Sequence, residues 1–416
     1  MSPNPPGTEP PPLPVPPPLS APPPLPAPPP SGAIARLADV FRRQPVLYPL
    51  IAMVLLLGFN LLFTPHFAEL HIRNGMLCGS LVDILQNAAP VMLMAVGMTV
   101  VVAVAGIDLS VGSVLALAGT VAAMMMVHWG QPLWLAIAAG LAAAALAGMA
   151  NGMLVSLAGL QPIIATLILL VGGRGIAQAI TNDQKVDFAV APPWAADTLN
   201  RFEFLANGSL LGLPVPIYLV AAAAAGMVLL LRKTALGLYV EAVGSNARAA
   251  RLAGLQVHTV RIFAYVFSGL CAGLAGLVAT ADIRLADVSN AGLYAELDVI
   301  LAVVIGGTSL AGGKPRIVGS LIGAIILQTL TAMLQMHNIK TEHTLMVKAV
   351  VALAVCFLQS PLAGRIESRM APMRNDGGDN AHGRPSVGSN EHGGKPHGKP
   401  SVGFEGVESS DGEASR

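Results

Sequence analysis

The chain has 416 residues, of which 54% are hydrophobic and 11% are charged, whereas soluble proteins carry roughly 25% charged residues. Its mean hydropathy is +0.65. The polar residues are too few to cover a water-facing surface, so the composition predicts an integral membrane protein. The 24 basic and 23 acidic residues nearly cancel, which argues against a nucleic-acid-binding protein.

The two ends of the chain are predicted to be disordered. Residues 1–44 include the proline-rich stretch 22–30, and proline cannot donate the backbone hydrogen bonds of a helix. This head lacks the basic, apolar and small-residue regions of a signal peptide. Residues 363–416 are rich in Gly, Ser, Asn, His and Glu, a composition typical of a disordered polar tail.

Residues 45–362 are predicted to form one all-α membrane domain. A helix needs about 20 apolar residues to cross a bilayer. We expect about ten transmembrane helices, within a range of eight to ten, in the apolar runs 46–63, 88–105, 109–127, 133–157, 163–180, 215–231, 262–280, 297–310, 317–336 and 345–358. The run 297–310 is short and interrupted by glycine, so a re-entrant or discontinuous element is the alternative there.

The placement of Lys and Arg predicts the orientation. With ten spans and an internal N-terminus, a clear excess of basic residues falls on one side. Because basic residues are retained in the cytoplasm, both termini and the loop 232–261 are predicted to be cytoplasmic. The segments 181–213 and 281–296 are predicted to face the opposite side.

The sequence contains no motif for catalysis or nucleotide binding. Residues 307–315 resemble a phosphate loop, but that pattern needs Gly at 308 and Ser or Thr at 315, where this chain has Thr308 and Pro315. The three cysteines lie far apart and show no metal-binding spacing. We therefore expect no enzyme, no metal site and no cofactor bound by this chain. The glycines of 307–315 are better explained by the close approach of backbones at a turn, with direct lining of the translocation path as the alternative.

The loop 232–261 contains a short predicted helix. Asn246 is a good N-cap, residues 247–253 are mostly strong helix formers, and Gly254 suits the left-handed position after a helix. An ordinary basic loop is one interpretation, and a docking element for a soluble partner is the other, which the capped helix favours. The candidate docking residues are Glu241, Gly244, Asn246, Arg248, Arg251 and Gly254, with apolar contacts from Ala247, Ala250 and Leu252.

Four polar residues at membrane depth are candidates for the translocation path or its gate. Arg174 lies near the middle of an apolar run. A charge there is costly, so it either pairs with a carboxylate such as Asp108, Asp298 or Glu296, or contacts the substrate. Asp108 lies at a helix junction, where it either caps the next helix or acts in the path. Asn151 suits hydrogen bonds to substrate hydroxyls or to neighbouring helices, and Asp298 is a second candidate carboxylate.

Three segments, taken in order, resemble one known family. They are Gly-Ile-Asp-Leu-Ser-Val-Gly at 106–112, the loop 241–254, and Val-Ile-Gly-Gly-Thr-Ser-Leu-Ala-Gly-Gly-Lys at 304–314. Together they resemble the permease subunits of bacterial ribose-, arabinose- and xylose-type ABC importers. Segments 74–80, 232–237 and 281–293 are most similar to galactofuranose-type permeases. The chain departs from the family pattern at Ser245, where Gly or another small residue is expected, and at Pro315, where Gly or Arg is commoner.

The resemblance implies a type II ABC importer-like permease in the bacterial inner membrane. It would translocate a monosaccharide, either a pentose or a hexose, with galactofuranose among the candidates. A separate cytoplasmic ATPase subunit would consume ATP with Mg, and the loop 241–254 would couple to it. A periplasmic sugar-binding protein would deliver the sugar, and a second permease subunit, identical or a sister, would complete the pair.

Two other transporter classes serve as alternatives. An ion-coupled secondary transporter of a small polar solute would need coupling carboxylates or histidines within the spans. Asp108 and Asp298 are the carboxylates that suit this role. A channel would need a repeated pore-lining filter, which the sequence does not show.

Overall fold

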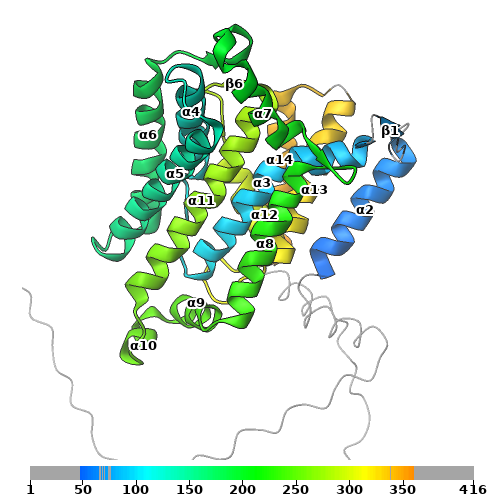
Figure 1. The fold of residues 1–416 in the computed structure, drawn as a ribbon. Helices are drawn as coiled ribbons and strands as arrows, with labels where there is room; N and C mark the ends of the chain where they lie inside the picture. The colour runs from blue at the N-terminus through cyan, green and yellow to red at the C-terminus, as the bar shows by residue number, and fades with distance from the viewer. Residues whose placement is uncertain are drawn as a thin grey trace, which may run out of the picture. The chain divides into compact units, whose positions relative to one another are not determined.

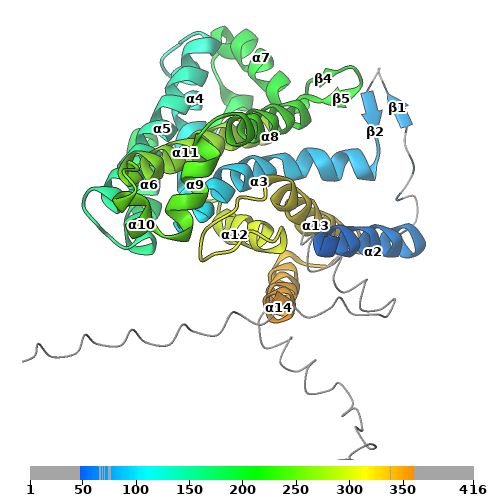
Figure 2. The same cartoon turned by 90° about the horizontal axis from the view of Figure 1, so that it is seen from below.

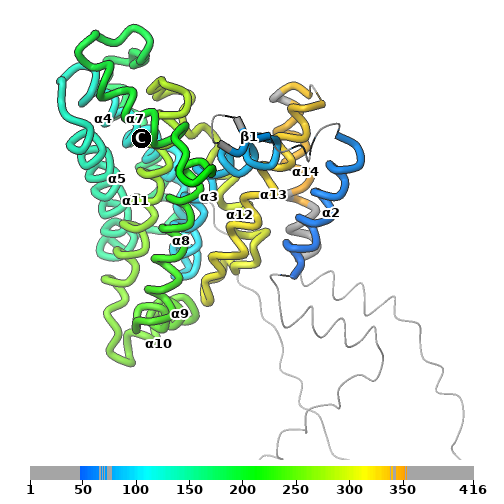
Figure 3. Tube along the Cα trace, turned by 45° about the vertical axis from the view of Figure 1, so that its right-hand side comes forward, coloured from blue at the N-terminus to red at the C-terminus, as the bar shows by residue number. Residues whose placement is uncertain are grey.

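The computed structural model describes residues 47–359, apart from 65, 66, 68, 70, 74, 75 and 338. These residues form a bundle of α-helices with short β pairings (Figure 1). The helices α9 (Leu236–Ser245) and α10 (Ala247–Leu252) lie at the opposite end of the bundle from α7 (Ala196–Asn207) (Figure 3). We call these the α10 end and the α7 end. The predicted head 1–44 and tail 363–416 lie outside the described residues.

Each of the predicted apolar runs overlaps one helix of the bundle. Their bounds are α2 Leu47–Phe63, α3 Ser80–Ala103, α4 Val111–Val127, α5 Leu133–Ser156, α6 Pro162–Thr181, α8 Val215–Lys233, α11 Val257–Ile283, α12 Ala295–Ile305, α13 Ile317–Met336 and α14 Thr341–Gln359. Two 3-10 turns are η1 Phe188–Val190 and η2 Pro193–Ala195. The antiparallel pairs are β1 His71–Arg73 with β2 Met76–Cys78, β3 Val186–Asp187 with β6 Leu285–Ala286, and β4 Ser209–Leu210 with β5 Leu213–Pro214.

Six helices in the described part of the chain are long and apolar enough to cross a membrane: α3, α5, α6, α8, α11 and α13. The helices α2 and α4 are apolar but have 17 residues each. At 11 residues, α12 extends only about 16 Å, roughly half of the hydrocarbon core. The predicted all-α membrane fold is confirmed, whereas the count of ten spans stays a prediction.

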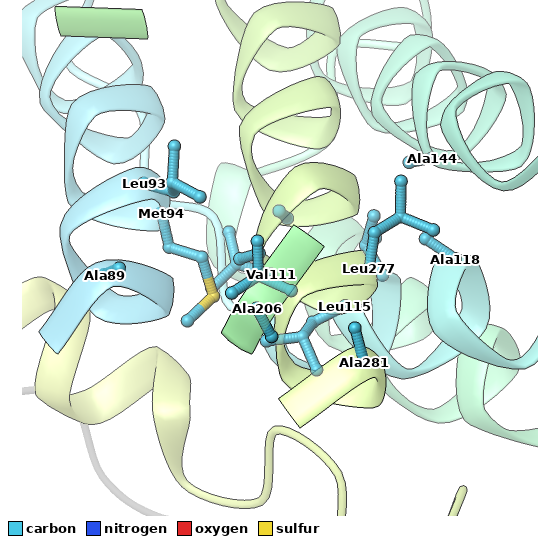
Figure 4. Packing of buried hydrophobic residues seen from close by; sticks show 14 of the residues in the cluster. Ala89, Leu93, Met94, Val111, Leu115, Ala118, Ala144, Ala206, Leu277 and Ala281 are labelled. Atoms are coloured by element: carbon cyan, nitrogen blue, oxygen red, sulfur yellow. The ribbon is translucent and has the colours of Figure 1, made fainter. Parts of the chain in front are cut away.

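The helix α11 lies at the centre of the bundle and packs against α3, α4 and α5. Viewed from the α10 end, α3 lies between α11 and α13 (Figure 2). Glycine permits these close approaches, since a Cβ added at Gly97 would lie 2.8 Å from the Cα of Ser268 on α11. In the apolar core, Leu277 of α11 lies beside Ala118 and Ala144 (Figure 4). Small residues at such crossings let helix backbones pack closely in lipid, which explains the abundant Gly and Ala.

The rim of the bundle keeps large apolar side chains exposed. Leu62 of α2 and Val171 of α6 are 81% and 73% exposed. In a soluble protein such surfaces would aggregate, whereas in a bilayer they face lipid. Trp129 and Trp134 are also exposed, around the turn between α4 and α5. Tryptophan is enriched at membrane interfaces, so this turn suits the boundary between lipid and water.

Candidate functional site

The three segments that resemble one family meet in the structure. Residues 104–110 join α3 to α4, residues 306–316 join α12 to α13, and α9 packs against α3. Gly313 donates its backbone N–H to the carbonyl of Ala103 at 2.9 Å. A Cβ added at Gly244 of α9 would overlap that same carbonyl oxygen, and one at Gly312 would lie 2.6 Å from the carbonyl oxygen of Gly244. We call Ala103, Gly244, Gly312 and Gly313 the glycine junction.

The end of α3 explains why this junction forms. The chain leaves α3 through Ala105 at φ 58°, and the N–H groups of residues 105 and 106 bond back to the carbonyls of residues 102 and 101. This Schellman motif satisfies some terminal carbonyls and leaves that of Ala103 for Gly313. Gly312 and Gly313 have φ of 90° and 110°, which side chains rarely adopt. The glycine-rich sequence is therefore needed for the loop to reach α3.

A buried polar cluster follows the junction directly. Asp108, which is 1% exposed, accepts hydrogen bonds at Oδ1 from the N–H and Oγ of Ser110, at 3.0 and 2.6 Å. Its Oδ2 accepts one from Ser268 Oγ on α11 at 2.9 Å. Asn151 on α5 donates Nδ2 to Ser110 Oγ at 2.8 Å. The Tyr265 hydroxyl donates to the carbonyl just before Asp108 at 3.2 Å. We call Asp108, Ser110, Asn151 and Ser268 the polar cluster.

The contacts of the polar cluster give Asp108 and Asn151 structural roles. Asp108 shapes the turn before α4 by accepting the N–H of Ser110, and it also ties that turn to α11. Hydrogen-bond donors offset part of the cost of burying its carboxyl group. Asn151 bonds to a neighbouring helix junction, although its Oδ1 has no hydrogen-bond partner among the described residues. Ser268, which completes the cluster, was missed in the sequence because an isolated serine in an apolar run carries no distinctive pattern.

The predicted capped helix at the α10 end is confirmed. Asn246 Oδ1 accepts from the N–H groups of Arg248 and Ala249 at 3.1 and 3.0 Å. Gly254 follows the helix with φ 84°. The helix itself, Ala247–Leu252, ends one residue earlier than expected. Glu241 and Gly244 belong to the separate helix α9, so the candidate docking residues divide between two helices.

The outward face of α10 differs from the prediction. Ala250 is only 5% exposed and packs in this chain's own core, so its predicted role as a partner contact is wrong. Its orientation follows from the turn of the helix back onto α11. Leu252 is 86% exposed, and Arg248 and Arg251 are exposed as well. The surface that α10 offers is therefore one large apolar side chain flanked by two guanidinium groups.

Arg174 and Asp298 lie outside the polar cluster. Arg174 donates from Nη1 to the backbone carbonyls of Val288 and Ser289 at 2.6 and 3.1 Å. Among the described residues it makes no ion pair within 4 Å with the three predicted carboxylates, although its charge still acts on Glu296. The carbonyls of the turn after β6 supply the acceptors instead.

The acid Asp298 has a cationic partner that the sequence analysis did not name. Lys348 Nζ on α14 lies 2.7 Å from its Oδ2, and the two side chains are 14% and 27% exposed. Lysine at membrane depth is costly unless paired, and Lys348 lies inside the predicted run 345–358. The rule that a charge at membrane depth needs a partner, which pointed to Arg174, therefore also applied to Lys348 and could have predicted this pair.

At the α7 end, the two segments predicted to share one side do meet. The strands β3 and β6 pair through Val186 with Ala286 and Asp187 with Leu285. Two ion pairs also join the segments, Lys185 with Asp287 at 2.8 Å and Arg284 with Glu203 at 3.3 Å. The sequence analysis missed α7 between them. Its buried residues are Leu199, Phe202 and Ala206. Their helical spacing could have predicted this helix from the sequence.

The carboxyl group of Asp287 is held in its charged form. Burial raises its pKa, but hydrogen bonds from Lys185 and Asn290 lower it by more, so the net pKa is below the ordinary value. Asp287 also accepts from the backbone N–H groups of Ser289 and Asn290 at 3.1 and 3.3 Å. It therefore fixes the same turn whose carbonyls bind Arg174.

Two cavities at the α7 end flank Asn87, in the outer part of α3. The first has a volume of about 120 Å³, and its polar lining residues are Gln86, Asn87, Thr280 and Asp282. The second has a volume of about 330 Å³, and its polar lining residues are Ser80, Asp83, Asn87 and Gln335. Apolar residues such as Pro90, Pro216, Ile84 and Met336 form the remaining walls. Both cavities therefore offer amide, hydroxyl and carboxylate groups between apolar surfaces.

No three or more His, Cys, Asp or Glu side chains in the described part of the chain are grouped to hold a metal ion. The predicted absence of a cofactor stays a prediction.

The apolar helices and exposed rim define a multi-pass membrane protein. Residues 80–356 match a family described as "Branched-chain amino acid transport system / permease component", and the chain belongs to this permease family. It is 46% identical over 321 residues to the galactofuranose transporter permease protein of Escherichia coli strain K12, covering 77% of this chain and 91% of that relative.

Two further relatives carry the names of other sugars. The chain is 38% identical over 329 residues to the fructose import permease protein of Bifidobacterium longum, covering 79% of this chain and 91% of the relative. It is 38% identical over 304 residues to the ribose import permease protein of Escherichia coli strain K12, covering 73% of this chain and 90% of the relative. No solved structure matches the chain.

Proposed function

We propose that this chain is the membrane permease subunit of an ABC importer that translocates a monosaccharide into a bacterial cell. The observation that carries the proposal is the match to permeases named for galactofuranose, fructose and ribose along about nine-tenths of their length. The convergence of three motif segments at the glycine junction supports it, because those segments also carry the family resemblance.

The cavities at the α7 end favour a neutral sugar over a branched-chain amino acid. Each hydroxyl stripped of water needs a replacement hydrogen bond, at a cost of about 1–3 kcal/mol if none is made. Amides and carboxylates at Gln86, Asn87 and Asp282 suit hydroxyl groups. An amino acid also carries a carboxylate, and the described lining residues of both cavities include no Lys or Arg that could pair with it.

The two carboxylates named for ion coupling, Asp108 and Asp298, are engaged in other contacts, which favours ATP-driven import. A secondary transporter needs a carboxylate that is available to the coupling ion. Both oxygens of Asp108 accept hydrogen bonds from serine groups, and Asp298 is paired with Lys348. The energy would come from a separate cytoplasmic ATPase that binds ATP with Mg. Its closure would displace α9 and α10, and the bundle would reorient as a rigid body.

The proposed assembly follows from the orientation predicted from the placement of Lys and Arg. The α10 end would face the cytoplasm and contact the ATPase through Leu252, Arg248 and Arg251. The α7 end would face the periplasm and receive a sugar-binding protein. A second permease subunit, identical or a sister, would complete the membrane part in the inner membrane, and both termini would be cytoplasmic.

Uptake into proteoliposomes tests the proposal. The permease is reconstituted with its ATPase and binding protein, and uptake of labelled ribose, fructose and galactofuranose is compared with uptake of leucine. We expect uptake of at least one sugar that requires ATP and persists with an ionophore present. Sugar uptake abolished by the ionophore while ATP stays constant would support the secondary transporter, and leucine uptake alone would overturn the sugar assignment.

The docking surface has its own test. Leu252→Asp places a charge on the exposed apolar side chain of α10 and should reduce co-purification of the ATPase. Leu211→Asp is the matched control, since Leu211 is 92% exposed but lies in the turn between β4 and β5. Equal ATPase recovery with both variants would remove Leu252 from the contact.

A further inference from the structure

The segment 104–110 between α3 and α4 is held on two sides. On one side, the glycine junction joins it to α9 and to the loop before α13. On the other side, the polar cluster joins it to α5 and α11 through Asn151 and Ser268. It therefore lies between the helices that would meet the ATPase and the helices at the centre of the bundle.

We propose that this segment is a mechanical link, in which Asp108 and Ser268 are positioning residues that transmit the displacement of α9 to α11. This inference rests on the proposed ATP-driven import. At the glycine junction, the contacts join backbone to backbone, so no flexible side chain absorbs a displacement of α9. The end of α3 must move with it.

The chain between the junction and the polar cluster is short. Ala105 and Asp108 are three residues apart, a distance that spans at most about 10 Å when fully extended. The Tyr265 hydroxyl also holds the carbonyl before Asp108. Displacement of α3 is thus passed to Asp108, whose Oδ2 accepts a hydrogen bond from Ser268 Oγ on α11 at 2.9 Å.

The polar cluster also joins the segment to α5. Asn151 Nδ2 donates to Ser110 Oγ at 2.8 Å and lies 3.4 Å from Asp108 Oδ1. The segment is therefore held by α5 and α11 at the same time.

The coupling ratio, measured as sugar molecules imported per ATP hydrolysed, tests the link. In the reconstituted complex, Ser268→Ala removes the donor to Asp108, and Asp108→Asn replaces one acceptor oxygen by a donor. Thr329→Ala is the matched control, because among the described residues its buried hydroxyl bonds only to a carbonyl in its own helix. We expect normal ATPase recovery and continued ATP hydrolysis in all three, with a coupling ratio lowered at least about fivefold in the first two only.

A second readout follows the movement itself. Ile283→Cys, on a background without the native cysteines, places a reactive thiol on the exposed last residue of α11 at the α7 end. A non-hydrolysable ATP analogue should change its labelling rate in the otherwise wild-type complex and leave it unchanged with Ser268→Ala.

The outcomes separate the two proposals. If Asp108→Asn lowers the membrane level, Ser268→Ala carries the test, since it keeps the carboxylate and its bonds to Ser110. Normal coupling and normal labelling changes with Ser268→Ala would overturn the link. Failure of the wild-type complex to import sugar with ATP would instead overturn the proposed function.

Discussion

Gly244→Ala is the smallest change that tests the packing of α9 on α3. The added Cβ would overlap the carbonyl oxygen of Ala103 and lie 2.6 Å from the backbone nitrogen of Gly313. Both neighbours are backbone atoms, so neither can rotate away. The methyl group must separate α9 from the end of α3 and stretch the hydrogen bond between Gly313 and Ala103.

The expected cost follows from two contributions. Overpacking a tight contact costs about 1–3 kcal/mol, and loss of one backbone hydrogen bond adds about 0.5–1.5 kcal/mol. Replacing Gly by Ala inside a helix returns up to about 1 kcal/mol. The net destabilisation of the junction is therefore on the order of 1–3 kcal/mol, which is enough to shift a two-state equilibrium by a factor of about 5–150.

Gly226→Ala provides the matched control. Gly226 lies within α8, and a Cβ there meets nothing within 4 Å, so the variant should gain stability from helix propensity alone. Thermal unfolding of both purified variants in detergent should differ by on the order of 5 °C. Uptake should fall in Gly244→Ala only. Equal unfolding temperatures and equal uptake in the two variants would refute the packing argument.

Three further changes have distinct expected outcomes. Arg174→Ala removes charged hydrogen bonds to two carbonyls and should lower the free energy of unfolding by about 2–3 kcal/mol. Arg201→Ala breaks an exposed i,i+4 ion pair and should lower it by only a few tenths of a kcal/mol. Thermal unfolding in detergent measures both effects. The pKa of Asp287 is lowered on folding, so its charged carboxylate stabilises the fold above about pH 4, and this stabilisation is lost as pH falls through the folded-state pKa. Lys185→Ala raises the folded-state pKa towards the ordinary value, so the stabilisation should be lost at a higher pH. Hydrogen exchange of the loop, measured against pH, checks this. Gly254→Val forces a β-branched residue to positive φ, at about 1–2 kcal/mol, and should reduce ATPase co-purification more than Gly254→Asn does.

The sequence predicted local structure where the governing chemistry is local. The cap at Asn246 and the left-handed Gly254 follow from hydrogen bonds and sterics within one turn, and both are present in the structure. The apolar runs likewise coincide with helices, because their lengths are set by the bilayer. How many of the shorter helices cross the membrane depends on tilt and neighbours, which composition does not contain.

Contacts across the bundle could not be predicted in the same way. Asp108 and Ser268 are 160 positions apart, and nothing local distinguishes Ser268 from other small residues in apolar runs. The partners of Arg174 are backbone carbonyls, which every residue possesses and no sequence pattern marks. Ala250 was misplaced for a related reason, since the rotation of a six-residue helix is set by its packing on α11.

The glycine-rich loop before α13 leads to a last prediction, that the purified permease alone binds no ATP. A phosphate site needs several backbone N–H groups that converge on an open space. Here the N–H of Gly313 donates to the carbonyl of Ala103, and the N–H of Gly312 donates to the carbonyl of Ser309. The N–H of Ala311 donates to the Ser309 hydroxyl. The N–H of Arg316 is taken by the Thr308 hydroxyl at 3.3 Å. These donors serve the protein's own acceptors, so the glycines provide packing against α3. Equilibrium binding of a fluorescent ATP analogue to the isolated permease and to the complex with its ATPase checks this, and saturable binding to the isolated permease would contradict it.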